Sequence, residues 1–251
     1  MSDELNGKIA LVTGASRGLG AAIARELGAR GAKVAVNYHS DHRGADGVVD
    51  DITAGGGSAA KFRFDVTDQQ AAKDMVAEIR KAMGPIDIVV NNATGPQPFV
   101  TIERQTWQDH LDQLVFFVKA PLAILQAVVG DMKASRRGRI VNIGSEVVEI
   151  GSAEFGHYVA AKAAMLGLTR SWANELGPWG ITVNLVAPGW IPVERHASMD
   201  SASLAAYAGA VPLRRQGKPR DVAEAVAFLA SDAANFITGQ KIAVNGGNTL
   251  G

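Results

Sequence analysis

Short runs rich in β-branched residues alternate with longer segments of helical periodicity, and this alternation strongly constrains the fold. The predicted strands span residues 9–13, 34–37, 61–64, 86–90, 139–143, 181–186 and 241–244. The predicted helices lie near residues 19–30, 42–54, 68–83, 103–134, 157–176 and 219–231. Strands of this kind separated by helices are typical of βαβ units, in which helices cover both faces of a parallel sheet. The sequence therefore predicts a doubly wound α/β fold.

Composition narrows the class of protein. Of the 251 residues, 47% are hydrophobic, which is enough for one α/β domain spanning residues 1–251. The 25 basic and 25 acidic residues cancel, so we expect neither nucleic acid nor a membrane as a partner. The chain has no cysteine, which excludes disulfides and a thiolate nucleophile and fits a reducing cytoplasm. The five histidines lack metal-ligand spacing, and we expect no membrane-spanning segment.

A glycine-rich turn follows the first predicted strand and leads directly into the first predicted helix. Its candidate cofactor-binding residues are Gly14, Ser16, Arg17, Gly18, Leu19 and Gly20. Glycines allow the backbone to approach a pyrophosphate closely, and a helix N-terminus attracts the negative charge. In this position between strand and helix, the turn predicts a dinucleotide site. The alternative is an ordinary strand-to-helix turn.

The end of the second predicted strand favours NADP(H) over NAD(H). An NAD site usually has an acidic residue there, but residues 36–40 contain none, and the first carboxylate after the strand is that of Asp41. Arg17 and Ser40, together with His39, are instead placed to bind a 2′-phosphate. A charge-assisted contact of this type contributes roughly 1.5–3 kcal/mol, which predicts on the order of a ten- to hundredfold preference for NADPH. The alternative is that Arg17 is a solvated turn residue.

Tyr158 and Lys162 are four residues apart in a predicted helix, and Ser145 follows the fifth predicted strand. Positions i and i+4 share one helix face, so the phenol and the ammonium can point into one pocket. A neighbouring cation lowers the pKa of a tyrosine, which suits a general acid and base. A serine hydroxyl can hold the substrate oxygen. Alone, such a tyrosine–lysine pair is usually a surface pair, so the interpretation depends on the other motifs.

Together these motifs resemble those of the short-chain dehydrogenase/reductase family, including its 3-oxoacyl-(acyl-carrier-protein) reductase-like members, over about residues 7–247. The glycine pattern and the catalytic candidates Ser145, Tyr158 and Lys162 match the family in residue type and spacing. The resemblance implies a parallel seven-stranded Rossmann sheet and commonly a homotetramer. It also makes Tyr158 and Lys162 cofactor contacts. The further cofactor contacts that it implies are Asp65, Val66, Asn92, Ala93, Pro188, Gly189 and Ile191.

The resemblance implies an NADP(H)-dependent oxidoreductase that acts on a 3-oxoacyl thioester, a ketone, or a sugar or polyol. In the direction of reduction, hydride passes to the carbonyl carbon while Tyr158 donates a proton to the oxygen. Ser145 orients that oxygen, and Lys162 contacts the nicotinamide ribose and lowers the pKa of the tyrosine. The irregular segment 188–211 is a candidate lid over the substrate. The alternative function is a nucleotide-binding scaffold or redox sensor with little catalysis.

Three positions depart from the family pattern. The family usually has an asparagine on the helix after the fourth strand, where this chain has Leu114 or Phe117, depending on the alignment. Thr94 replaces a glycine, and we expect this loop to run differently because a β-branched residue resists a positive φ. Val193 replaces a threonine that often binds the carboxamide. The missing asparagine motivates the scaffold alternative, whereas the intact serine, tyrosine and lysine argue against it.

Charged groups give opposing indications about the substrate. Glu146, Glu149 and Glu154 follow Ser145 and would favour a hydroxylated or cationic substrate. The basic run at residues 136–139 would suit an acyl carrier protein, which is acidic. The plainer interpretation of both groups is solvated surface charge. The helices at 103–134 and 157–176 carry more apolar residues than one buried face needs, so we expect them to be buried on several sides, by the sheet or by another subunit. The family resemblance favours the subunit.

Overall fold

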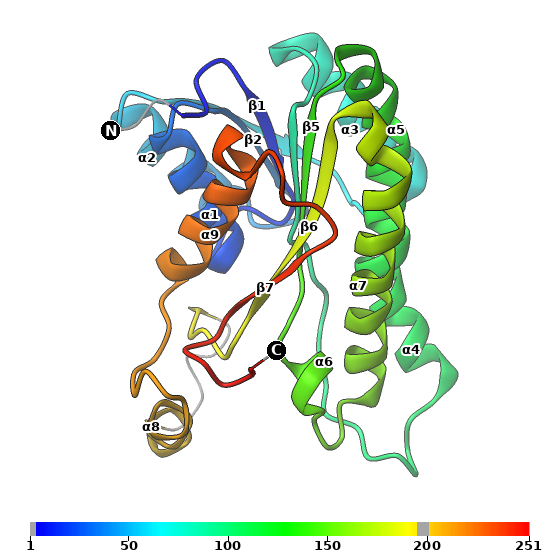
Figure 1. Cartoon of the computed structure of the whole chain (residues 1–251), viewed down its shortest axis with the longest axis vertical. Coiled ribbons are helices and arrows are strands. Elements are labelled where there is room, and N and C mark those ends of the chain that lie inside the picture. Colours follow the sequence, from blue (N-terminus) through cyan, green and yellow to red (C-terminus); the bar gives the residue numbers. More distant parts are fainter. Residues whose placement is uncertain (1–3, 195–200, 251) are drawn as a thin grey trace.

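The computed structural model describes residues 4–194 and 201–250, and a seven-stranded parallel sheet forms its centre (Figure 1). The strands are β1 (Ile9–Val12), β2 (Lys33–Tyr38), β3 (Ser58–Arg63), β4 (Ile88–Asn91), β5 (Gly138–Ile143), β6 (Ile181–Pro188) and β7 (Lys241–Val244). Their order in the sheet is β3-β2-β1-β4-β5-β6-β7. The chain reverses its direction of winding between β1 and β4, where open α/β sheets form a ligand crevice at the carboxyl ends of the strands.

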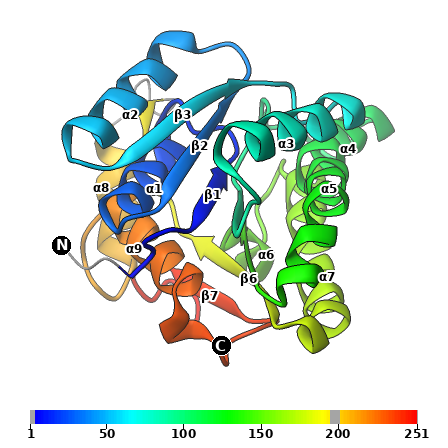
Figure 2. The ribbon, with the colours of Figure 1, turned by 90° about the horizontal axis from the view of Figure 1, so that it is seen from above.

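Helices cover both faces of the sheet (Figures 1 and 2). One face carries α1 (Gly18–Ala29), α2 (His42–Ala54) and α9 (Pro219–Ala230). The other carries α3 (Gln69–Met83), α4 (Trp107–Leu114), α5 (Ala120–Ser135) and α7 (Gly156–Leu176). The short helices α6 (Val147–Ile150) and α8 (Ser201–Ala210) lie at the same end of the molecule. The predicted doubly wound α/β fold with a seven-stranded parallel sheet is confirmed.

Two apolar layers join the helices to the sheet. On one face Ile23 and Leu27 of α1 belong to a cluster with Val226 of α9, and all three are fully buried. On the other face Met75 of α3 and Ile124 of α5 share a second cluster. Full burial of an aliphatic side chain contributes roughly 1.5–3 kcal/mol, so these contacts hold the helices in position. The packed helices thereby fix the positions of the strand ends, from which the loops of the site extend.

Several element boundaries differ from the prediction. β3 begins at Ser58 rather than at residue 61 because it pairs with β2 along its full length. The predicted helix 103–134 begins only at Trp107, since Thr106 and Asp109 form a capping box there. It is also interrupted by a π-helical turn, Val115–Lys119. The candidate lid, residues 188–211, contains α8, and its residues 195–200 lie outside the described part of the chain.

The continuous stretch Trp107–Ser135 is long and apolar enough to cross a membrane by length and composition, because an 18-residue window within it has a mean hydropathy of 1.7. The expectation that the chain has no such segment is therefore wrong by those two criteria. Phe117, Ile124 and Met132 of this stretch are each 1% exposed and belong to the core. Such burial is typical of a core helix in a globular fold, and core helices of this kind also meet the criteria of length and composition.

Candidate active site

The glycine-rich turn joins the carboxyl end of β1 to α1. Gly14 and Gly18 adopt positive φ angles of 61° and 59°, which favour glycine. Gly20 is required by close packing, because a Cβ there would lie 2.3 Å from the Gly14 carbonyl oxygen and 2.5 Å from Asn92 Nδ2. The N-cap residue of α1, Arg17, makes no side-chain capping bond. The amides at this helix N-terminus therefore suit a phosphate group.

Two polar side chains that the sequence analysis did not single out hold this turn in place. Asn37 of β2 is 2% exposed, and its Oδ1 accepts a hydrogen bond of 3.2 Å from the Gly14 amide. Thr13 Oγ1 accepts hydrogen bonds from the amides of Asn92 and Ala93 at 2.9 and 3.0 Å. The turn, β2 and the loop after β4 are thus joined. The sequence could have indicated Asn37, because it is a polar residue within an apolar strand. Burial of a polar side chain is costly unless it forms hydrogen bonds.

The chain after β2 presents exposed polar and basic groups beside this turn. Arg17, His39 and Ser40 are all exposed. Asp41, the carboxylate that follows them, accepts a hydrogen bond of 3.0 Å from the Gly44 amide and caps α2. The Asp41 carboxylate is therefore engaged in capping α2. The arrangement suits a phosphate better than a pair of ribose hydroxyls.

Asp65 and Val66 follow β3. Val66 is buried, while Asp65 Oδ1 accepts hydrogen bonds from the Thr67 amide and hydroxyl at 2.9 and 2.7 Å. Burial acts to raise the pKa of Asp65, but the hydrogen bonds from Thr67 outweigh it and hold the pKa below its usual value. The Asp65 carboxylate is therefore ionised near neutral pH and fixed in orientation.

Tyr158 and Lys162 lie in the first two turns of α7 and are both buried, at 7% and 4% exposure. Lys162 Nζ donates a hydrogen bond of 2.6 Å to the carbonyl oxygen of Ile143, the last residue of β5. Ser145 follows two residues later and is half-buried. The structure thus brings the lysine to the end of the strand that leads to the serine. Burial of both α7 side chains rules out the surface-pair alternative.

The position of the missing asparagine falls at the π-helical turn. Leu114 ends α4, and Phe117 lies within the turn at 1% exposure. The centre of the Phe117 ring is 3.7 Å from Lys162 Nζ, and the ring meets Tyr158 edge-on at 5.5 Å and 84°. An aromatic face stabilises a nearby ammonium, most strongly where water is excluded. Phe117 therefore packs against both α7 candidates.

The turn after β6 packs against the loop after β5. The Glu146 amide donates a hydrogen bond of 3.0 Å to the Pro188 carbonyl oxygen. The Trp190 amide donates one of 2.9 Å to the hydroxyl of Tyr207 on α8. A Cβ at Gly189 would lie only 2.2 Å from that hydroxyl oxygen, so this position requires glycine. Hydrogen bonds therefore connect the turn after β6 to Glu146, which follows Ser145, and to α8.

The chain beyond this turn returns to the glycine-rich turn. Ile191 is 5% exposed and belongs to the core cluster on the α1 face of the sheet. A Cβ built on Gly18 would lie 3.6 Å from Val193 Cβ and 3.6 Å from the Glu194 carboxylate. The described start of the candidate lid therefore lies beside the first turn of α1. Val193 supplies no hydroxyl at the place where many family members have threonine.

Two of the three glutamates after Ser145 have partners within the protein. Glu146 is 4% exposed and accepts hydrogen bonds from the Tyr207 hydroxyl at 2.8 Å and from the Asn248 side chain at 3.0 Å. Burial chiefly, and the Glu146 carboxylate, raise the pKa of Tyr207. Glu149 forms an ion pair of 2.8 Å with Lys241. The structure thus adds Tyr207 and Asn248, whose partners lie far away in the sequence.

The basic run at residues 136–139 is divided among internal contacts. Arg137 pairs with Asp87 at 2.5 Å. Arg139 is 6% exposed, pairs with Asp232 at 3.2 Å, and has its pKa lowered, chiefly by burial. Arg136 is exposed and donates a hydrogen bond of 3.0 Å to the Pro178 carbonyl oxygen. The run is therefore largely structural.

The loop after β4 accommodates Thr94 without a positive φ. Among the described residues, positive φ angles outside glycine occur at Arg136, Glu154 and Arg214. Gly95 has a different role, because a Cβ there would lie 2.3 Å from the Phe116 ring. The glycine of this loop is therefore explained by close packing against the π-helical turn.

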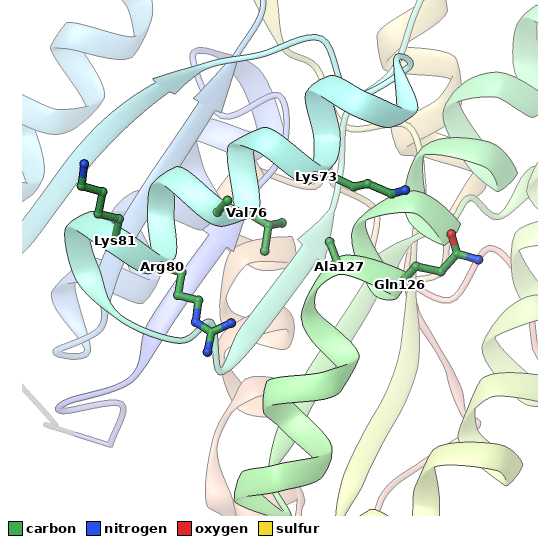
Figure 3. A pocket seen from close by; sticks show the side chains of 7 residues that line it. Lys73, Val76, Arg80, Lys81, Gln126 and Ala127 are labelled. Atoms are coloured by element: carbon green, nitrogen blue, oxygen red, sulfur yellow. The ribbon is translucent and has the colours of Figure 1, made fainter.

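A separate cavity of about 610 Å³ lies between α3 and α5 (Figure 3). Its lining residues are Lys73, Val76, Ala77, Arg80, Lys81, Gln126 and Ala127. This lining includes none of the predicted site residues and no acid–base pair. Within residues 4–194 and 201–250, no group of three or more His, Asp or Glu side chains is placed to hold a metal ion. The loops at the carboxyl ends of the strands, which carry the predicted site residues, therefore remain the candidate active site.

Residues 14–249 match the family model described as enoyl-(acyl carrier protein) reductase. The Rossmann sheet, the glycine-rich turn and the serine–tyrosine–lysine set define the class, and the chain belongs to the short-chain dehydrogenase/reductase family. It is an oxidoreductase that acts on carbonyl and hydroxyl groups.

The chain is similar to 3-oxoacyl-(acyl-carrier-protein) reductase FabG of Staphylococcus aureus and of Escherichia coli K12, at 40% identity to each. Both alignments cover 96% of this chain and 97% of the relative. A solved structure of a blue fluorescent protein from a metagenomic library, in complex with NADPH, is 36% identical with a TM-score of 0.89. The promiscuous reductase LugOII, which catalyses keto-reduction at C1 during lugdunomycin biosynthesis, is 35% identical with a TM-score of 0.90. Each match covers 98% of this chain and 100% of the solved one.

Proposed function

We propose that this protein is an NADP(H)-dependent reductase of carbonyl compounds that uses Tyr158 as its general acid and base. The observation that carries the proposal is the burial of Tyr158 and Lys162 on one face of α7, with Lys162 bonded to the end of β5 beside Ser145. An ammonium and a phenol do not share a buried site without a functional or structural reason. The location at the carboxyl ends of parallel strands favours function.

The proposed roles follow from the chemistry of each side chain. Bound NADPH supplies the hydride for the carbonyl carbon. Tyr158 donates its phenolic proton to the carbonyl oxygen, so that hydride and proton together form the alcohol. The Ser145 hydroxyl donates a hydrogen bond to the same oxygen as negative charge develops on it. The Lys162 ammonium favours the phenolate that remains, and it also binds the nicotinamide ribose.

The cofactor is NADP(H), as the sequence predicts, and the NADPH complex of a structural neighbour supports this. The turn fits a pyrophosphate because Gly14, Gly18 and Gly20 leave its backbone open at an uncapped helix end. Arg17 and Ser40 would bind the 2′-phosphate. The other proposed contacts are Ser16, Leu19, Asp65, Val66, Asn92, Ala93, Tyr158, Lys162, Pro188, Gly189 and Ile191.

The proposal includes the setting of the enzyme. A ketone substrate is supported by the keto-reducing neighbour, and a 3-oxoacyl thioester on an acyl carrier protein by the names of the FabG relatives. One domain spans residues 1–251, and α8 with the described flanks of 188–211 forms a lid over the substrate. A cytoplasmic homotetramer is consistent with the cysteine-free sequence and with the exposed apolar residues of α4 and α5.

The decisive experiment measures NADPH consumption over a panel of ketones, 3-oxoacyl thioesters, ketosugars and quinones, with Tyr158→Phe alongside. We expect turnover that is lost in Tyr158→Phe, while titrations give the same NADPH affinity for both proteins and at least tenfold weaker NADH binding. Retained turnover in the variant would remove Tyr158 from the mechanism. Tight NADPH binding without turnover of any substrate would favour the scaffold or redox-sensor alternative.

A further inference from the structure

Three aromatic rings form a continuous stack between the protein surface and Tyr158. The ring centres of Phe99 and Phe155 are 4.7 Å apart, with an angle of 23° between the ring planes. Those of Phe155 and Tyr158 are 4.5 Å apart, with an angle of 24°. Exposure falls from 65% at Phe99 to 9% at Phe155 and 7% at Tyr158. The stack therefore leads from solvent to the proposed proton donor.

Hydrogen bonds hold the two loops that bear Phe99 and Phe155 together. The Val100 amide donates a bond of 2.7 Å to the carbonyl oxygen of Glu154, the residue before Phe155. The Gln105 side chain donates one of 2.9 Å to the Val100 carbonyl oxygen. Glu154 also has a positive φ of 61°, which costs on the order of 1 kcal/mol in a non-glycine residue. The fold thus sustains local strain at the point where the rings meet.

An aromatic side chain with most of its surface in water is a favourable surface for a ligand. Rings gain most when they meet other rings in offset or edge-on arrangements, and Phe99 is 65% exposed, so its ring can meet a ligand ring at the side of the stack. Pro96 and Pro98, in the same loop, are exposed as well. Ligand sites combine such apolar walls with a few polar groups that fix orientation. The exposed Glu154 adds a negative charge that disfavours an anionic ligand.

We propose that Phe99 and Phe155 form the recognition wall for the substrate, and that the preferred substrate is an uncharged ketone carrying a planar aromatic group. With the carbonyl at Tyr158, the aromatic group lies against the edges of the stacked Phe155 and Phe99 rings, because the faces of Phe155 are covered by Phe99 and Tyr158. This inference rests on the proposed function for the position of the carbonyl. It distinguishes aryl ketones from thioesters carried by an acidic protein.

The test uses cyclohexanone, 4-cyclohexylcyclohexanone and 4-phenylcyclohexanone, which differ only beyond the carbonyl ring. We expect kcat/KM to be highest for the phenyl compound, and Phe99→Ala to lower it about two- to tenfold, the range for one aromatic pair. Phe99→Tyr retains the ring and should restore the wild-type value. Cyclohexanone, which does not reach Phe99, should be reduced equally by all three proteins.

Phe236→Ala is the matched control, because Phe236 is also an exposed phenylalanine but lies just before β7, outside the aromatic stack. Equal losses for all three ketones, or no loss for the phenyl compound in Phe99→Ala, would overturn the proposal.

Calorimetric binding of 4-phenylcyclohexanone to the Tyr158→Phe protein, with and without Phe99→Ala, separates recognition from catalysis. Binding that depends on Phe99 without turnover in the wild type supports the wall and removes the proposed reaction. Binding that is independent of Phe99 overturns the wall whether or not ketones are reduced.

Discussion

The Lys162 side chain is buried, and its Nζ atom lies 3.7 Å from the centre of the Phe117 ring. A desolvated cation–π contact contributes about 2 kcal/mol. We therefore expect Phe117→Leu to lower kcat about tenfold or more, because the ammonium loses its fixed position beside Tyr158. Steady-state kinetics with saturating NADPH measure the change.

A core change of similar size separates this positional effect from general loss of stability. Phe62 of β3 is 4% exposed and lies in a different core cluster, so Phe62→Leu should lower the melting temperature without the tenfold loss of kcat. Equal kcat losses in both variants would show that Phe117 acts only through packing.

Residue-level prediction succeeded where the relevant partners are close in sequence. The four-residue spacing of Tyr158 and Lys162 predicts one helix face, and the structure buries both on that face. It did not find Tyr207, because its acceptor Glu146 is 61 residues away and the hydrogen bond exists only after the sheet forms. Asn37 was missed for the same reason, as its partner Gly14 lies across a βα turn.

At the scale of elements, Tyr207 connects α8 to the ends of β5 and β6 through Glu146 and Trp190. Tyr207→Phe removes both hydrogen bonds and leaves the Glu146 carboxylate short of a buried donor, at a cost of about 1–3 kcal/mol. We expect this variant to raise the KM of the substrate and to make the chain near α8 more sensitive to proteolysis. Limited trypsin digestion with kinetics on the same samples measures both effects.

The same contact predicts a pH dependence. Burial and the Glu146 carboxylate raise the pKa of Tyr207 above its unfolded value, so the protonated phenol stabilises the folded state at neutral pH. That contribution is complete below the ordinary tyrosine pKa of about 10 and is lost as the pH rises above it. The melting temperatures of wild type and Tyr207→Phe should therefore converge at alkaline pH. A constant difference from pH 7 to pH 11 would contradict this assignment.

Element types followed from periodicity, whereas boundaries depended on tertiary contacts. The predicted strand 181–186 extends to Pro188 because β7 pairs with its last residues. The π-helical turn Val115–Lys119 was not predicted, since one extra residue in a helical turn hardly changes the apolar pattern of a long helix. α8 was predicted as irregular because its alanine-rich sequence gives no amphipathic signal.

At the scale of the molecule, parallel topology brings distant motifs together. The glycine-rich turn, Asp65, Asn92, Ser145 and Gly189 each follow the carboxyl end of a different strand. Because those ends lie along one edge of the sheet, the order of motifs in the sequence was sufficient to predict a common site. Loop conformation was not predictable in this way, since the Phe99–Phe155 stack depends on the Val100–Glu154 hydrogen bond between two loops.

The outer surface of α5 and α7 is expected to be covered by another subunit. Leu122 of α5 is 39% exposed, and a Cβ built on Gly167 of α7 would meet no atom within 4 Å. A stable interface buries at least about 1,000 Å², and small residues let helices approach closely enough to form one. We expect the wild type to be a homotetramer in light scattering, and Leu122→Glu to shift it to a smaller species because the interface would bury an unpaired charge.

Ile102→Glu, in an exposed loop at 76% exposure, is the control and should leave the assembly unchanged. A wild-type monomer at micromolar concentration would mean that this apolar face meets solvent, and the assembly prediction would then be wrong.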